Sequence, residues 1–323
     1  MSSDSLNKST AGRVVDYGNG TYSVYFFAAW AGDAYVHIGL RFNREGVLFL
    51  ENVIKNKEKL ITYTANYTNG SVIDIRPCAL VNEDAQTLPP VLQSCAADLP
   101  VPLSDGYWKD RSVFVSFVCK SQQWTKQQIS TCLADKKLIL CGDSTLMQIE
   151  HSLTPIRGID IVSHFVYPRV GNVVVRFKNG VLESDLLDRI VQPNCSSSNF
   201  VIVLNFAFHY GAFTNRAYLE RIYHARLAVQ RLMLRCPTSK IVIKLLHPRD
   251  NIFIEQSIHS ANWVFYDMNR IIRRVFGGIG VHFLDIWDMV LSSFENKTVH
   301  MPPTVIVQEV HLMLSYICPE MVT

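Results

Sequence analysis

The stretch 137-KLILCGDSTLMQIEHSL-153 decides the fold class, because a short apolar run is followed at once by a helical pattern. Lys137 to Leu140 has the composition of a buried strand, and the turn after it is Cys141-Gly142-Asp143-Ser144. Apolar side chains then recur at helical spacing, at Leu146, Ile149 and Leu153. A strand that leads directly into a helix is the repeating unit of α/β proteins, so this stretch predicts one such unit.

The same alternation continues to the end of the chain. Further apolar runs of strand length occur at Ile159 to Phe165, Phe200 to Phe206, Lys240 to Leu246 and Val281 to Ile286. Helical stripes occur at Asn215 to Arg235, at Asn262 to Phe276 before a Gly277-Gly278 stop, and at Val305 to Ile317. We expect an α/β domain with an open parallel sheet over residues 131–323.

The first part of the chain has a different pattern. From Arg13 to Ile38 apolar and polar residues alternate, and the turn Asp16-Tyr17-Gly18-Asn19-Gly20 predicts a β hairpin. The stretch from Glu51 to Asp105 holds five prolines and few periodic apolar positions. We therefore expect a partial β domain at 1–60, a connecting region with cysteine and proline at 61–130, and the α/β domain after it.

Composition and charge indicate which classes of partner to expect. The chain has 323 residues, 48% of them hydrophobic, and a formal net charge of +3 from scattered Lys and Arg. A nucleic-acid partner is therefore not expected. The apolar runs are all shorter than the roughly 20 residues that a membrane span needs, so we expect no span in this chain.

Cysteine and glycosylation patterns indicate an oxidising compartment. The eight cysteines have no spacing suited to zinc and favour disulfides, so no metal or other bound cofactor is expected. Asn-X-Ser/Thr tripeptides include those at Asn19, Asn66, Asn194 and Asn296, which are candidate glycosylation sites. The polar N-terminus lacks the apolar stretch of a signal peptide. We expect a secreted or lumenal protein whose sequence here is truncated at the N-terminus.

Ser144 and His300 are the candidate catalytic residues. Ser144 ends a strand and opens a helix, where backbone N–H groups can stabilise an oxyanion, although a helix-capping serine is the alternative. His300 lies in Val299-His300-Met301-Pro302-Pro303, a loop that can bring the ring to Ser144 as a general base. A surface loop histidine is the alternative there.

The sequence resembles the neurexophilin and PC-esterase domain (NXPE) family at both ends. The resemblance rests on these segments: Cys141-Gly142-Asp143-Ser144-Thr145, Val299-His300 before Cys318, Ala11 to Phe26, Trp30-Ala31-Gly32 and Glu45-Gly46-Val47. It implies an SGNH-hydrolase-like three-layer α/β/α domain preceded by part of an immunoglobulin-like β domain. It also implies relatives that add or remove O-acetyl groups on glycans.

The site departs from the family pattern in two places. Leu146-Met147-Gln148 stands where the family motif has an arginine, and Lys297 stands where the general fold has an aspartate. Of the nearby carboxylates Asp285 and Asp288, we expect Asp288 to complete a triad, although both can equally be solvated carboxylates or helix caps.

Three further residues are candidates for the oxyanion hole or the cleft: Gly142, Asn205 and His209. Asn205 can supply a side-chain donor or simply cap a buried strand. His209 can line the cleft or be a structural histidine.

Two functions remain open at this point. The first is an O-acetyltransferase or O-acetylesterase that forms an acetyl-serine at Ser144, acts on a glycan that can be sialylated, and in the transferase case uses acetyl-CoA as donor. The second is a catalytically degenerate module that binds a glycan or a cell-surface protein.

Overall fold

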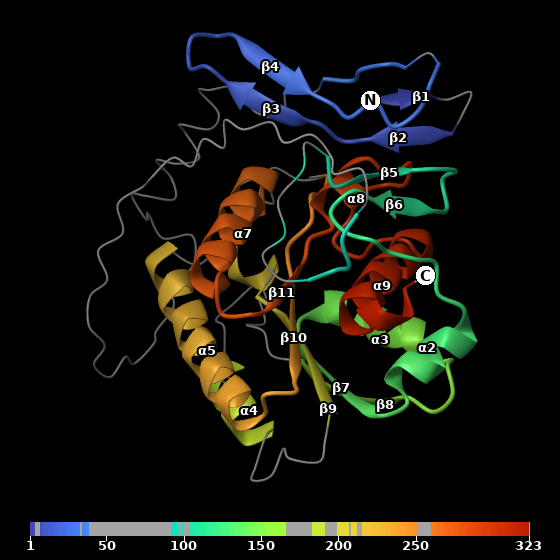
Figure 1. Ribbon diagram of the computed structural model, residues 1–323. Helices are drawn as coiled ribbons and strands as arrows, with labels where there is room; N and C mark the ends of the chain where they lie inside the picture. Colours follow the sequence, from blue (N-terminus) through green and yellow to red (C-terminus); the bar gives the residue numbers. More distant parts are fainter. Residues whose placement is uncertain are drawn as a thin grey trace.

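The computed structural model describes residues 1–3, 7–32, 34–38, 92–96, 99, 102, 104–165, 183–190, 199–206, 208–211, 215–250 and 260–322. Their helices and strands form a layered α/β body, with an antiparallel β region above one end of it (Figure 1).

The centre of the body is a five-stranded parallel sheet in the order β11-β10-β9-β7-β8. Its strands are β7 (Lys136–Gly142), β8 (Asp160–Phe165), β9 (Asn199–Asn205), β10 (Lys240–Lys244) and β11 (His282–Leu284). Each lies within or beside an apolar run that predicted it. The chain passes from β7 to β8 on one side and then returns to β9 on the other, so the strand order reverses at β7.

Helices cover both faces of this sheet (Figure 1). One face carries α2 (Lys126–Leu133), α3 (Ser144–Leu153) and α9 (Pro303–Ile317). The other carries α4 (Glu183–Ile190), α5 (Asn215–Arg235) and α7 (Asn262–Phe276). The predicted three-layer α/β/α domain is confirmed.

Two hydrophobic cores follow from the two-residue period of the strands. In β7, Leu138 and Leu140 belong to the core under α9, whereas Ile139 and Cys141 belong to the core under α5. Both faces of each central strand are buried, which is why these strands are continuous apolar runs in the sequence.

The antiparallel region contains the predicted hairpin. Strands β3 (Arg13–Asp16) and β4 (Tyr22–Tyr25) pair with Arg13 opposite Tyr25 and Asp16 opposite Tyr22. A separate four-stranded sheet joins β1 (Ser2–Ser3), β2 (Lys8–Thr10), β5 (Gly106–Trp108) and β6 (Phe114–Ser116). Strands from the first ten residues and from residues 106–116 thus share one sheet, while the predicted domain boundaries stay a prediction.

The described part also contains three short helices, the 3-10 helix η1 (Phe208–Tyr210), α8 (Trp287–Leu291) and the C-terminal 3-10 helix η2 (Pro319–Met321). Of these, α8 contacts the antiparallel region. Trp108 of β5 is buried and donates its indole N–H to the carbonyl of Met289 in α8, at 2.9 Å. The small sheet is therefore fixed to the α/β body through α8.

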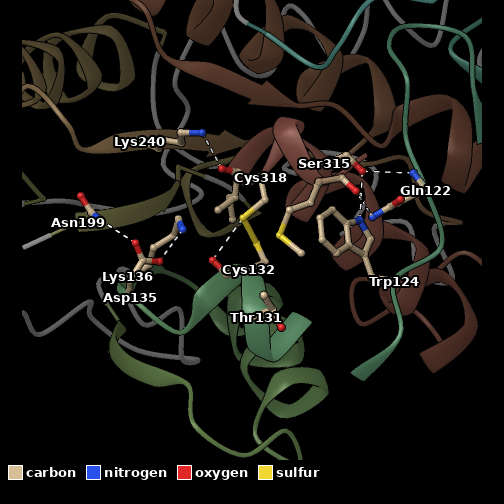
Figure 2. The surroundings of a disulfide bond; sticks show 12 residues. Gln122, Trp124, Thr131, Cys132, Asp135, Lys136, Asn199, Lys240, Ser315 and Cys318 are labelled. Carbon is tan, nitrogen blue, oxygen red and sulfur yellow. Dashed lines mark hydrogen bonds and ion pairs between the residues drawn. A yellow bond between two sulfur atoms is a disulfide. The ribbon is translucent and has the colours of Figure 1, made fainter. Parts of the chain in front are cut away.

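The structure contains disulfides, which the cysteine pattern favoured without indicating their pairing. Cys132 in α2 is bonded to Cys318 at the end of α9, and Cys95 is bonded to Cys119. Around the first bond, Lys240 Nζ donates to the carbonyl of Ile317 at 2.6 Å (Figure 2). Cys236 is also disulfide-bonded, and Cys141, whose pairing the sequence left open, is a buried free thiol.

Among the helices that the structure describes, none has the length and apolarity to cross a bilayer.

Candidate active site

The candidate site lies at the carboxyl edge of the parallel sheet. Gly142 ends β7, Asn205 ends the neighbouring β9, and Ser144 begins the helix that follows β7. In open α/β sheets, ligands bind outside the carboxyl ends of strands at the point where the strand order reverses. Ser144 stands at that point.

The start of α3 prepares a donor for a negative charge. Asp143 caps the helix: its Oδ1 accepts from the backbone N–H of Thr145 at 2.9 Å and from the Thr145 hydroxyl at 2.7 Å. The backbone N–H of Leu146 donates to the carbonyl of Asp143 at 3.0 Å. The N–H of Ser144 has no hydrogen-bond acceptor among the described residues, so it is available at the positive end of the helix.

His300 meets Ser144 directly. Its Nε2 lies 2.7 Å from Ser144 Oγ, although the two residues are far apart in the sequence. The ring is exposed in the loop between α8 and α9, and Ser144 is half-buried. In the neutral tautomer with the proton on Nδ1, the serine hydroxyl donates to Nε2, which is the arrangement that general-base activation needs.

The loop that carries His300 is anchored on both sides. Gln148, one helical turn after Ser144, donates through Nε2 to the carbonyl of Met301 at 2.8 Å. The hydroxyl of Thr298 donates to the carbonyl of His300 at 2.6 Å, and His247 Nε2 lies 3.2 Å from the carbonyl of Thr298. Gln148 thus ties the helix that begins at Ser144 to the loop that carries His300.

His247 can hold this loop because it stays neutral. Burial, followed by the positive charge of Lys244, lowers the pKa of His247 to about 3. The ring packs edge-on against Phe208 with centroids 4.8 Å apart. A neutral ring with its proton on Nε2 donates that proton to the Thr298 carbonyl without adding a charge beside His300.

The structure does not bring Asp288 to His300. Asp288 is buried and its Oδ2 accepts from Arg13 Nη1 at 2.6 Å and from the backbone N–H of Asp105 at 3.0 Å. Asp285 is paired with Arg273 at 2.6 Å. Lys297, at the position where the general fold has an aspartate, donates to the carbonyl of Ser293 at 3.3 Å. In the part of the chain that the structure describes, no carboxylate is hydrogen-bonded to His300.

The three cleft candidates lie at different depths. Asn205 is buried beside α3 and donates through Nδ2 to Thr145 Oγ1 at 3.4 Å. Gly142 lies beside it, at the end of the neighbouring strand β7. His209 is half-buried in η1.

Gly142 is required by close approach to its neighbours. A Cβ added there would lie 2.7 Å from the Asn205 Cβ and 2.9 Å from the Leu146 Cδ1. We therefore expect Gly142→Ala to push Asn205 away from Thr145 and to lower the free energy of unfolding by about 1–3 kcal/mol. Urea denaturation measures this difference, and an unchanged midpoint would show that Asn205 moves aside without cost.

A fully buried ion pair links the end of β10 to α9. Lys244 Nζ donates to Glu309 Oε1, and neither side chain is exposed. Burial raises the pKa of Glu309, while Lys244 lowers it. Sequence analysis missed this pair, although each partner is a charge inside an apolar strand or helix. A positive charge in one apolar segment and a negative charge in another could therefore have predicted a buried ion pair.

The neighbouring thiol offers no competing nucleophile. Cys141 is buried in β7, and burial, followed by the charge of Glu183, raises its pKa to about 12. A thiol in that state stays protonated and unreactive, so Ser144 is the reactive candidate on this turn.

Two candidate glycosylation sites are accessible. Asn19, in the hairpin turn, and Asn296, in the loop before His300, are both exposed. Asn66 and Asn194 lie outside the described residues.

Two family models match the chain. One, described as NXPE family member 4-like, C-terminal domain, matches residues 157–318, and one described as Neurexophilin matches residues 1–94. The first contains His300 and covers half of the chain, and Ser144 lies before its first residue. These matches confirm the resemblance drawn from the sequence.

Similar solved structures include three with esterase or lipase names. A carbohydrate acetylesterase from Sinorhizobium meliloti is 10% identical, with 57% of this chain and 100% of that chain covered and a TM-score of 0.38. A carbohydrate esterase family 2 enzyme plus carbohydrate binding domain from Corynascus thermopiles is 11% identical, with 67% of this chain and 71% of that chain covered and a TM-score of 0.39. A GDSL-like lipase from Bacteroides thetaiotaomicron is 12% identical, with 60% of this chain and 91% of that chain covered and a TM-score of 0.37. With TM-scores this low, the chemistry of the site has to be derived from its own geometry.

Proposed function

Because this chain belongs to the NXPE family, we propose that it carries out serine-dependent acyl-ester chemistry on glycans, as an O-acetylesterase or an O-acetyltransferase. The observation that carries the proposal is the 2.7 Å separation between Ser144 Oγ and His300 Nε2 at the carboxyl edge of the sheet. The glycan substrate class follows the family resemblance.

The first step forms an acetyl-serine. Ser144 Oγ attacks the carbonyl carbon of an acetyl ester, and His300 Nε2 takes the hydroxyl proton. The negative charge on the carbonyl oxygen falls beside the Ser144 N–H at the helix N-terminus, which stabilises it. The bond to the leaving oxygen or sulfur then breaks, and His300 returns the proton to that atom.

The second step releases the acetyl group. The neutral His300 takes a proton from water or from a sugar hydroxyl as that oxygen attacks the acetyl carbon, and Ser144 leaves with its proton restored. Water as acceptor makes the protein an esterase, and a sugar makes it a transferase. Acetyl-CoA is the proposed donor in the transferase case.

His300 is oriented here by its loop. Gln148, Thr298 and His247 fix the backbone on both sides of the ring. A backbone held in this way limits the positions of the ring without a carboxylate behind Nδ1. We propose that Ser144 and His300 act as a dyad whose geometry the loop provides.

We place this chemistry outside the cytosol. The disulfides Cys95–Cys119 and Cys132–Cys318 are of the kind that persists in oxidising compartments. Exposed acceptor asparagines at Asn19 and Asn296 agree with that location.

Mass spectrometry of sialoglycans tests the proposal. Purified, glycosylated protein is incubated with O-acetylated and with de-acetylated sialoglycan, each with and without acetyl-CoA. Loss of acetyl without donor is expected of an esterase, and donor-dependent gain is expected of a transferase. No change on either glycan with folded protein would favour binding of a glycan or a cell-surface protein without catalysis.

A further inference from the structure

A cavity of about 330 Å³ lies away from Ser144, beside the edge strand β11. It is lined by residues of β6, α7, α8 and α9. Its walls carry two carboxylates, a guanidinium, a phenol and two phenyl rings, from Asp105, Asp285, Arg273, Tyr316, Phe114 and Phe283. The volume is within the range of small-molecule sites in proteins.

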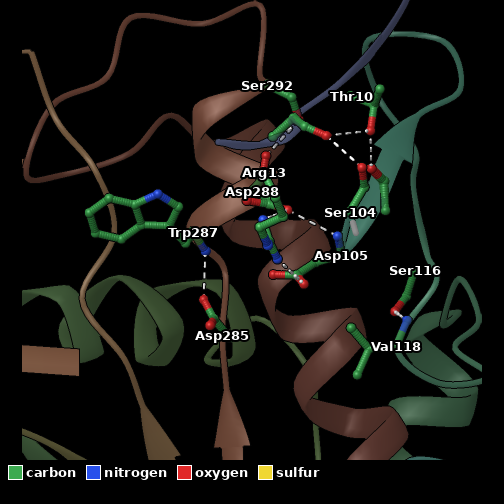
Figure 3. Close-up of polar contacts among 12 residues, drawn as sticks. Thr10, Arg13, Ser104, Asp105, Ser116, Val118, Asp285, Trp287, Asp288 and Ser292 are labelled. Atoms are coloured by element: carbon green, nitrogen blue, oxygen red, sulfur yellow. Dashed lines mark hydrogen bonds and ion pairs between the residues drawn. The ribbon is translucent and has the colours of Figure 1, made fainter. Parts of the chain in front are cut away.

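The charges around this cavity do not balance. Arg13 of the hairpin donates to both Asp105, at 2.8 Å, and Asp288, at 2.6 Å (Figure 3). Arg273 is paired with Asp285 at 2.6 Å. When all three carboxylates are ionised, they share two guanidinium groups, and the excess negative charge falls on the group made by Arg13, Asp105 and Asp288.

Asp105 is the member of that group that lines the cavity. It is only 8% exposed. Burial, followed by the charge of Asp288, raises the pKa of Asp105 well above its ordinary range, and Arg13 only partly offsets this. A buried carboxylate with too little compensating charge is stabilised by a cation that enters the cavity.

A second group in the wall lacks a partner. Tyr316 is 6% exposed and lines the cavity, and its hydroxyl forms no hydrogen bond with any residue of the described ranges. The hydroxyl oxygen itself keeps some accessible surface, so it faces the open space of the cavity. A ligand in the cavity can therefore form a hydrogen bond with it.

We propose that this cavity binds a small organic cation, with a primary ammonium group on an apolar body. The ammonium donates hydrogen bonds to the Asp105 carboxylate and to the Tyr316 oxygen. The apolar body packs against Phe114 and against the edge of Phe283, whose ring already lies under the Arg273 guanidinium, 5.1 Å from its centroid. Arg273 does not oppose this binding strongly, because Asp285 neutralises it.

The affinity of the cavity for the ammonium ligand should increase with pH. The charged and titratable groups facing Asp105 are Arg13 from β3, Asp288 from α8, Asp285 after β11, Arg273 from α7 and Tyr316 from α9. Below its raised pKa, Asp105 is protonated and must release a proton when the ammonium binds. Affinity therefore increases as the pH rises towards that pKa and levels off above it.

Calorimetric titration of the full chain with benzylammonium, and with benzyl alcohol as the neutral probe of the same shape, tests the proposal. At mildly alkaline pH we expect benzylammonium to bind at least about tenfold more tightly than the alcohol. Asp105→Asn should remove that preference, whereas Asp160→Asn, an exposed carboxylate of β8, should keep it.

Two further variants keep the result decisive if Asp105→Asn fails to fold. Leu312→Trp fills part of the cavity and leaves every charge in place, so it should abolish binding of both probes. Tyr316→Phe should weaken benzylammonium more than benzyl alcohol. Equal binding of the two probes to the unaltered protein, or a preference that survives these variants, would overturn the proposal.

Discussion

Ser144→Ala should lower the rate of acetyl release from, or transfer to, a sialoglycan by at least about 1,000-fold. The alanine removes the oxygen that attacks the ester, while the helix, its Asp143 cap and the His300 loop keep their contacts. Binding of the glycan should change little, because the Ser144 hydroxyl is a single oxygen and contributes little to the affinity. The loss should therefore appear in kcat with a KM close to that of the unaltered protein.

His300→Ala should cost about as much as Ser144→Ala, and the double variant should cost hardly more. Residues that act as one unit in catalysis give strongly non-additive losses. Ser152→Ala, at the far end of the same helix, is the matched control and should retain full activity. If the two single losses were instead additive, Ser144 and His300 would not be working on the same proton.

Lys244→Met should lower the free energy of unfolding by about 3–5 kcal/mol. The variant leaves Glu309 buried with no opposite charge, and removing one partner of a buried pair costs far more than removing both. Urea denaturation at neutral pH measures the change.

The double variant Lys244→Met with Glu309→Leu is the control for that prediction. It replaces both charges with apolar side chains of similar length, so stability should return close to that of the unaltered protein or exceed it. A double variant as unstable as Lys244→Met alone would mean that the pair contributes through another contact.

The strands and helices could be predicted because their hydrophobic patterns are local. The helices Asn215–Arg235 and Asn262–Phe276 have the bounds that their apolar stripes predicted. The last helix begins two residues earlier than predicted, at Pro303, because proline fits the first helical turn. The central strands were predictable because both faces are buried, which gives continuous apolar runs.

The site was predictable only in part. The order of strand, serine and helix places Ser144 at the carboxyl edge, and a loop histidine after the last strand can reach it. The anchors of that loop are backbone carbonyls of Thr298 and Met301 that accept from His247 and Gln148. Which side chains donate to such carbonyls depends on packing between distant elements, and no local pattern encodes it.

The surroundings of Asp288 show the same limit. The sequence placed it near the last strand and left open a role at His300 or in the structure. In the structure its partners are Arg13 and the backbone of Asp105. Both residues are far from Asp288 in the sequence, so only the packing of the β region on α8 reveals them.

The central claim is that His300 activates Ser144, and labelling with a fluorophosphonate probe tests it most directly. The phosphonylated peptide is mapped by mass spectrometry in the unaltered protein, in Ser144→Ala and in His300→Ala. We predict that Ser144 is labelled in the unaltered protein, that Ser144→Ala carries no label, and that His300→Ala is labelled far more slowly. Absence of label on Ser144 in folded protein, or labelling at the same rate without His300, would contradict the account.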